Sequence, residues 1–218
     1  MLLAFAAPLP AVDMLYVTLS NNTIVSYDTS SGNAATIAAS VATFASTNLN
    51  APHGLAFDSS GNLYAANVGN STISKFDSSG TYVSSGSIST NLVNPTGLAF
   101  DSSGNLYAGN LGNNTISKFN SSGAYVSSGS IPSTNLLNPL GLAFDSSGNL
   151  YAANLGNSTI SKFDSSGSFL TSWSTGTAKP SFLAFKPVSV PEPSTYALAA
   201  IATGVMAYLA RRRKARTT

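Results

Sequence analysis

A fourteen-residue segment recurs three times in the middle of this chain, and its period limits the folds that the chain can adopt. Its copies occupy residues 54–67, 97–110 and 141–154 and differ at only one position. The period is 43 and then 44 residues, which is typical of propellers and other repeat arrays. Helical repeats are disfavoured, because the segment is rich in Gly, Asn and Ser and its apolar runs are short and bounded by turn residues.

Each repeat is predicted to contain four short strands separated by turns. In the first copy the strands are expected at residues 54–57, 63–66, 72–76 and 82–84. The intervening Asp-Ser-Ser-Gly sequences form turns, because Asp bonds its own backbone and Gly accepts positive φ. Four strands in about 40 to 45 residues make one propeller blade. The spacing of Ile73 and Phe76 breaks the period of two, which predicts a bulge or strong twist in the third strand.

These residues resemble the NHL repeat, whose pattern runs Pro-x-Gly-Ile-Ala-Val-Asp, Gly-Asn-Ile-Tyr-Val-Ala-Asp and Asn-x-Arg-Ile. Here it appears as Pro-Thr-Gly-Leu-Ala-Phe-Asp at 95–101, Gly-Asn-Leu-Tyr-Ala-Gly-Asn at 104–110 and Asn-Asn-Thr-Ile at 113–116. The resemblance covers about residues 15–186 and implies a β-propeller. Two departures make the blades more neutral. Asn replaces the usual Asp at 67, 110 and 154, and Thr replaces the usual Arg at 72, 115 and 159.

The two ends of the repeat region match different strands of a blade. Residues 15–17 and 22–24 match the second and third strands without a first, whereas residues 182–185 match a first strand alone. We therefore expect residues 182–185 to pair beside residues 15–19 and to close a ring of four, which removes exposed strand edges. An open arc, or a ring completed by a second chain, is the alternative. The predicted fold is all-β: a small β-propeller of about four blades of four antiparallel strands, followed by one short C-terminal transmembrane helix.

The C-terminal tail combines a Pro-rich motif, an apolar run and a basic end, in that order. The Pro pair keeps its segment extended, so that a processing enzyme can read it. The uncharged run over 195–210 spans only about 24 Å as a helix, against a hydrocarbon core of about 30 Å. Basic residues hold the end of such a span at the cytoplasmic face. The motif consists of Val190, Pro191, Glu192, Pro193 and Ser194, and the basic end of Arg211, Arg212, Arg213, Lys214 and Arg216.

This tail resembles the PEP-CTERM sorting signal of Gram-negative bacteria. The resemblance implies export, recognition by an exosortase-type protease, removal of the tail and retention at the cell envelope or surface, with transient anchoring in the membrane. An ordinary C-terminal anchor is the alternative. Three regions are expected: a signal-peptide remnant at 1–11, an NHL-like propeller at 12–187 and the sorting tail at 188–218. An apolar N-terminal strand is the alternative for residues 1–11.

Charge and composition narrow the functional classes. Charged residues make up only 8% of the chain, and five of its ten basic residues lie in the tail. The body before the tail has five Lys and seven Asp, so a nucleic-acid partner has no electrostatic support. The chain has no Cys, which excludes disulfides, thiol nucleophiles and Cys-based metal sites.

The near-identity of the repeats argues against a catalytic site, because catalysis needs different groups converging on one point. His53 is the sole His and precedes a predicted first strand, so it is a candidate for the mouth of the central channel. One His cannot form a metal centre alone, and we expect no catalytic residue, metal or cofactor. Asp58, Asp101 and Asp145 are interpreted as turn formers rather than calcium ligands. A solvated ring is expected from the recurring Lys75, Lys118 and Lys162.

Two functional classes remain open. The first is a binding or structural protein of the cell surface, associated with exopolysaccharide, extracellular matrix or a surface protein. The alternative is a propeller-type lyase or lactonase that acts on an extracellular substrate. Enzymatic activity is the less favoured of the two.

Overall fold

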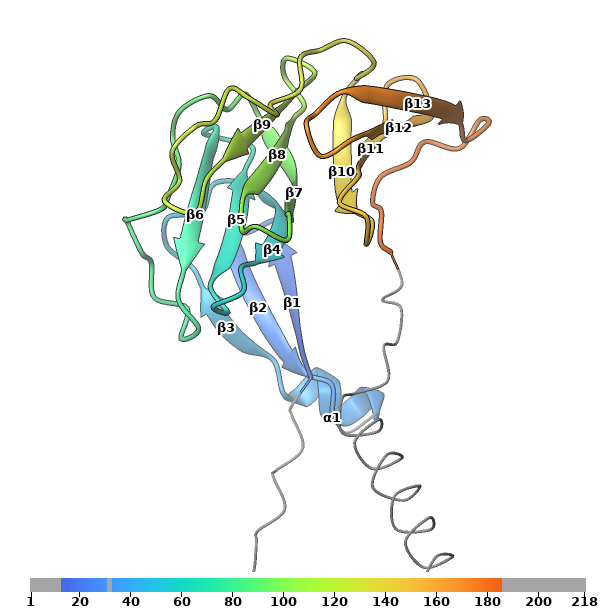
Figure 1. The fold of residues 1–218 in the computed structure, drawn as a ribbon. Coiled ribbons are helices and arrows are strands. Elements are labelled where there is room, and N and C mark those ends of the chain that lie inside the picture. The colour runs from blue at the N-terminus through green and yellow to red at the C-terminus, as the bar shows by residue number, and fades with distance from the viewer. Residues whose placement is uncertain (1–12, 31–32, 186–218) are drawn as a thin grey trace, which may run out of the picture. The chain divides into compact units, whose positions relative to one another are not determined.

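The computed structural model describes residues 13–30 and 33–185, which form four antiparallel sheets (Figure 1). The first sheet contains β1 (Met14–Leu19), β2 (Thr23–Asp28) and β3 (Ala42–Ala45), and the second contains β4 (Pro52–Phe57), β5 (Leu63–Asn67) and β6 (Thr72–Phe76). The third contains β7 (Pro95–Phe100), β8 (Leu106–Asn110) and β9 (Thr115–Phe119), and the fourth contains β10 (Pro139–Phe144), β11 (Leu150–Asn154), β12 (Thr159–Phe163) and β13 (Phe169–Ser174). The all-β prediction is confirmed.

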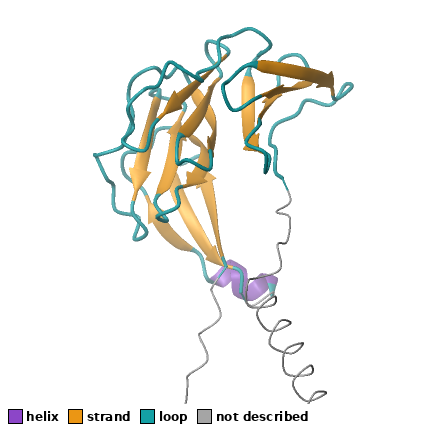
Figure 2. Cartoon of the chain, in the orientation of Figure 1, coloured by secondary structure: helices purple, strands orange, loops and turns teal. Residues whose placement is uncertain are grey.

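One short helix, α1 (Ala34–Ala39), lies between β2 and β3 (Figure 2). The side chain of Asn33 caps it by accepting bonds from the backbone N–H groups of Ala35 and Thr36, which is a common way to satisfy the first turn. No helix among residues 13–30 and 33–185 is long and apolar enough to span a membrane. The predicted signal remnant at 1–11, the sorting tail at 188–218 and its transmembrane helix lie outside the described residues.

Both faces of the interior sheets are covered, and this corrects one expectation. Ile73 and Phe76 are both fully buried, although alternation along a strand points them to opposite faces. The pairing of β5 with β6 is regular from Leu63–Phe76 to Asn67–Thr72, so their spacing requires no bulge there. Register shifts occur where β4 meets β5 and, in the fourth sheet, where the third strand β12 meets β13.

The fourth strand differs between the sheets. In the fourth sheet β13 is continuous, and it pairs with β12 from Phe163–Phe169 to Thr159–Ser174. In the second sheet it is reduced to two isolated bridges, Phe76–Tyr82 and Ile73–Ile88, and the third sheet has the equivalent pair. Six positions separate Tyr82 from Ile88 but only four separate Phe169 from Trp173. The extra residues arch away from the third strand, so the predicted strand at 82–84 is absent.

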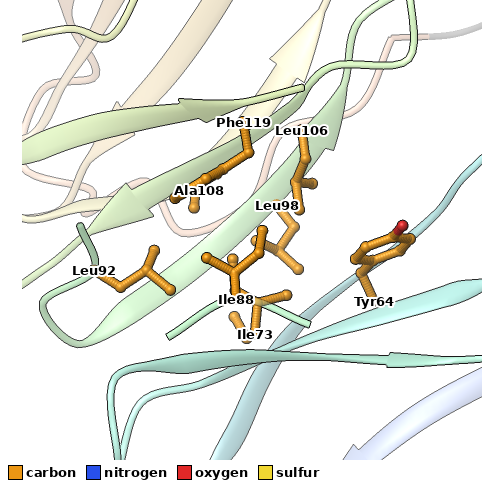
Figure 3. Packing of buried hydrophobic residues seen from close by; sticks show 9 residues of the cluster. Tyr64, Ile73, Ile88, Leu92, Leu98, Leu106, Ala108 and Phe119 are labelled. Carbon is orange, nitrogen blue, oxygen red and sulfur yellow. The ribbon is translucent and has the colours of Figure 1, made fainter. Parts of the chain in front are cut away.

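The sheets pack face to face in the same way at each internal junction. We call the side of a sheet that carries Tyr64 and its equivalents the front face, and the side that carries Leu63 and its equivalents the back face. The front face of the second sheet packs on the back face of the third (Figure 3), where one buried cluster contains Tyr64, Ile73, Ile88, Leu98, Leu106 and Phe119. Equivalent clusters join the first sheet to the second and the third to the fourth. This burial of apolar surface is the main stabilising contribution.

A buried Asn ends the second strand of each repeat and connects three segments of its sheet. Asn110 is fully buried, and its Nδ2 donates to the hydroxyls of Thr115 and Ser117 at 3.0 and 2.9 Å. Its Oδ1 accepts from the backbone N–H of Val93 at 3.1 Å. Asn67 and Asn154 make the same contacts in their repeats. Here neutral hydrogen bonds hold the position that the NHL pattern gives to an Asp.

The predicted closure of the ring differs from the structure. Residues 181–185 are not a strand, and they lie beside the fourth sheet rather than along β1. Gly141 abuts the backbone of Ser181 and Phe182, and the ring of Phe185 packs against that of Tyr151 at 4.9 Å. Phe182 and Leu183 nevertheless line the same cavity as Tyr16. The segment lies against β10, the first strand of the fourth sheet, in the same way that β10 lies against β7, the first strand of the third sheet.

We predict that Asn110→Ala lowers the free energy of unfolding by about 2 to 3 kcal/mol, because it leaves buried donors and acceptors without partners. The exposed Asn113 makes one hydrogen bond with Thr115, and Asn113→Ala should cost less than about 0.5 kcal/mol. Urea unfolding followed by circular dichroism measures both. Equal losses in the two variants would contradict a structural role for the buried amide.

Candidate functional site

β1 of the first sheet and the first strands of the other three sheets, β4, β7 and β10, border one central cavity of about 320 Å³. Glycines allow this close arrangement, because a Cβ on Gly54, Gly97 or Gly141 would collide with the backbone of the next inner strand or segment. The cavity is lined by Tyr16, Val17, Thr18, His53, Gly54, Leu55, Gly97, Leu98, Gly141, Leu142, Phe182 and Leu183. This lining is mostly apolar and backbone, and it contains no carboxylate.

His53 lies at this cavity, where the sequence predicted a channel-mouth position. It belongs to β4, and its exposed side chain is next to the buried Gly54. The Thr18 hydroxyl donates to the His53 carbonyl at 3.2 Å, so the contact involves the backbone rather than the imidazole. Within the described parts of the chain no group of three or more His, Asp or Glu side chains could hold a metal. The cavity therefore brings no acid or base partner to His53.

The Asp residues of the repeated loops form turns, as predicted. In the loop of Asp58, its Oδ1 accepts from the backbone N–H groups of Ser60 and Asn62, both at 2.9 Å. Its Oδ2 accepts from the Asn62 amide at 2.8 Å. Asp101 and Asp145 repeat these bonds. The carboxylate oxygens are thus engaged within their own turns.

The prediction of a solvated lysine ring is wrong. The Lys75 ammonium lies over the Tyr64 ring, 5.3 Å from its centroid, and 3.9 Å from Asp58. The corresponding ammonium of Lys162 lies over Tyr151 and 3.7 Å from Asp145. Lys118 packs in the same way on Tyr107. Each Lys ammonium covers the face of a Tyr ring on the front face of its own sheet, an arrangement that stabilises the blade through cation–π attraction.

Two grooves that the sequence did not reveal recur at equivalent positions on the second and third sheets. They have volumes of about 340 and 530 Å³ and exist because the fourth strand of these sheets arches outward. The shared polar lining is Asn48, Asn70, Thr72, Tyr82, Ser84 and Ser87 in one groove and Asn91, Asn113, Thr115, Tyr125, Ser127 and Ser130 in the other. Neither groove is lined by a charged side chain.

One tyrosine is anchored in each groove. The ring of Tyr82 packs edge-on against Phe76 at 6.1 Å, and the ring of Tyr125 packs against Phe119 at 6.0 Å. Tyr125 is nevertheless 42% exposed. An apolar ring surrounded by hydroxyl and amide groups can contact a ligand that is uncharged and rich in hydroxyls. In the fourth sheet the equivalent position is occupied by the continuous strand β13.

Two sequence-family models match the chain. Residues 49–76 match the NHL repeat, and residues 189–214 match the PEP-CTERM protein-sorting motif. The second match makes this an exported protein that is sorted to the cell envelope or surface and carries a substrate signal for exosortase processing. The comparison with curated proteins gives no match.

Solved structures with similar folds are propeller-type proteins. Virginiamycin B lyase from Staphylococcus aureus has a TM-score of 0.60 and 17% identity, over 82% of this chain and 61% of that one. A streptogramin B lyase has the same score and identity over 78% and 61% of the two chains. A chain of the nidogen/laminin complex has a TM-score of 0.63 and 20% identity, over 79% and 65%. At these identities the likeness shows the fold alone, and this chain spans less than two thirds of each.

We predict an acid-sensitive contribution from the Asp145 turn. Burial alone would raise the pKa of Asp145, but hydrogen bonds from Asn149, Tyr151 and Ser147 lower it to about 2. Because the pKa is depressed in the folded state, the stabilisation is present above the unfolded value of about 3.9 and is lost as the pH falls toward 2. We therefore expect the melting temperature, measured from pH 7 to pH 2, to fall less steeply below pH 4 in Asp145→Asn than in the wild-type protein. Parallel curves for the two proteins would contradict this.

Proposed function

We propose that this exported propeller is a binding module for uncharged polysaccharide in the extracellular matrix of a Gram-negative bacterium. Its tail would anchor it transiently in the membrane until an exosortase-type protease cleaves near Glu192. The sorting motif over residues 189–214 supports the route. The paired uncharged grooves around Tyr82 and Tyr125 support the ligand class and are the observation that carries this proposal.

The chemistry of the grooves suits sugar hydroxyls. Asn, Ser and Thr side chains provide both donors and acceptors, and a half-exposed Tyr ring offers an apolar surface to a sugar face. Both grooves have volumes within the range of ligand pockets, about 300 to 1,000 Å³. Because two equivalent grooves lie on one chain, a polymer with repeating units could occupy both, which raises the overall affinity through effective concentration.

A propeller-type lyase or lactonase remains the alternative, with His53 as its candidate residue. Two of the similar solved structures are lyases, which motivates the alternative without transferring an activity. The isolation of His53 from carboxylates in the cavity lining favours the binding role. Turnover of a lactone or polysaccharide that is abolished by His53→Ala would select the enzyme instead.

We predict that the full chain, kept soluble in mild detergent, binds uncharged glycans on an array. Tyr82→Ala and Tyr125→Ala should each weaken binding about tenfold, which corresponds to about 1.4 kcal/mol, because each removes the aromatic surface of one groove. Phe169→Ala is the matched control, since Phe169 takes the same repeat position where β13 fills the groove. Failure to retain any uncharged glycan, or an equal loss in Phe169→Ala, would overturn the ligand assignment.

We also predict processing of the tail in a host that has the matching protease. Mass spectrometry of surface-released protein should find a mature form that ends near Glu192. Replacing Pro191 and Pro193 by Ala should leave the tail in place, because the extended motif is lost. A released wild-type form that still carries Arg211 to Arg216 would refute processing and leave a simple anchor.

A further inference from the structure

Two sheet faces in this structure lack the cover that every internal junction provides. At the junction of the second and third sheets, Ile88 on the front face and Leu106 on the back face are 4% and 2% exposed. The equivalent of Leu106 in the first sheet is Leu15, which is 52% exposed. The equivalent of Ile88 in the fourth sheet is Trp173, which is 44% exposed. Within the described residues, one front face therefore exposes Trp173 and one back face exposes Leu15, although Val25 on that back face is buried.

An aromatic pair identifies the open front face as the beginning of another junction. At each internal junction a front-face Tyr packs edge-on against a Phe of the next inner strand. These pairs are Tyr16–Phe57, Tyr64–Phe100 and Tyr107–Phe144, with ring centroids 5.0, 5.1 and 5.0 Å apart. The fourth sheet repeats the pair with Tyr151 and Phe185 at 4.9 Å. A segment that corresponds in sequence to the first strand of a further sheet thus lies beside the fourth sheet, although it is not itself a strand.

The first sheet is the sheet that lacks an inner strand. β1 corresponds to the second strand of the other repeats and stands at the edge of its sheet. In the second sheet the inner strand pairs Phe57 with Leu63 and Leu55 with Ala65. Transferred to the first sheet, this register would place Phe185 opposite Leu15 and Leu183 opposite Val17. The sequence of segment 182–185 therefore fits the edge of β1. In the described part of the chain, the segment lacks a strand to pair with, and β1 lacks a neighbour on that edge.

We propose that these faces bind each other between two copies of this chain. The front face of the fourth sheet covers the back face of the first sheet of the second copy, and residues 182–185 add to the edge of its β1. Such a head-to-tail contact, made twice about a twofold axis, closes a ring of eight sheets and leaves no free copy of either face. Closure also removes the strand edge of β1, which otherwise invites nonspecific pairing.

Two observations favour a second copy over closure within one chain. In the single chain, Leu15 and Trp173 stay exposed and residues 182–185 do not pair with β1. The similar virginiamycin B lyase chain is covered to only 61% by this one, so this chain alone accounts for less than two thirds of that propeller-type chain. Neither β1 nor β13 carries a charged residue, and Lys162 on the front face of the fourth sheet is paired with Asp145 at 3.7 Å.

Cysteine cross-linking tests the proposal directly, because the chain has no Cys. Leu15→Cys and Trp173→Cys are prepared as separate full-length proteins in mild detergent, then mixed and oxidised. Cross-linked dimer is expected from the mixture, since only a contact between copies can join these two positions. A mixture of Val93→Cys and Trp173→Cys is the matched control and should stay uncross-linked. Absence of dimer in the first mixture would overturn the proposal.

Light scattering after size exclusion provides the second measurement. The wild-type protein component should have twice the chain mass of 22.2 kDa, and Leu15→Asp should reduce it to one chain mass with the strand content unchanged. If Leu15→Asp fails to fold, the cysteine mixture still decides. A double variant, Leu15→Cys with Trp173→Cys, that forms only an intrachain disulfide would refute the second copy and indicate closure within one chain. These readouts need no glycan, so they are independent of the proposed function.

Discussion

The packing of each sheet against the next is the constraint on which the rest of the structure depends. A single three-stranded sheet of this size cannot bury enough apolar surface on one face to be stable. In the second sheet, stacking buries Ile73 against the third sheet on one face and buries Leu63 and Phe76 against the first sheet on the other face. The same requirement explains why the apolar residues of the repeat ignore the alternation expected of a sheet with one wet face. Because every sheet face needs such a cover, the two outer faces of the array indicate where a further sheet would bind.

Neutral hydrogen bonding connects the strands within each sheet. Asn67, Asn110 and Asn154 are fully buried, and their partners are hydroxyls and backbone groups rather than a charged side chain. A buried ion pair has to recover a desolvation cost of several kcal/mol for each ion, whereas an amide with all its bonds made carries no such cost. The replacement of the Asp and Arg of the NHL pattern therefore removes charge without leaving buried polar atoms unsatisfied. No buried side-chain N or O atom lacks a partner in the part of the chain that the structure describes.

The small number of charged side chains also determines the chemistry of the candidate sites. The repeated Asp carboxylates accept hydrogen bonds within their own turns and the repeated Lys ammonium groups lie over Tyr rings, while the lining of the central cavity contains no carboxylate near His53. The two grooves are lined by uncharged hydroxyls, amides and tyrosines, and the faces at the two ends of the sheet array expose the apolar residues Leu15 and Trp173. The first suits an uncharged ligand and the second suits another sheet of the same kind. The two surfaces lie on different strands, so both could be occupied together.

The sequence by itself determined the repeat, the first three strands of each repeat, the turns at Asp58, Asp101 and Asp145, and the sorting tail. These features follow from local chemistry, because turn residues and short apolar runs specify their own conformation. Only the tertiary structure decided the positions of Lys75 over Tyr64, the arches that open the grooves, and the place of residues 182–185. Two repeats with the same third strand differ in their fourth, since the number of residues between its two bridges decides whether it stays paired. Closure of the ring likewise depends on how much each sheet rotates relative to the next, which is a sum of packing contacts that no single segment of the sequence encodes.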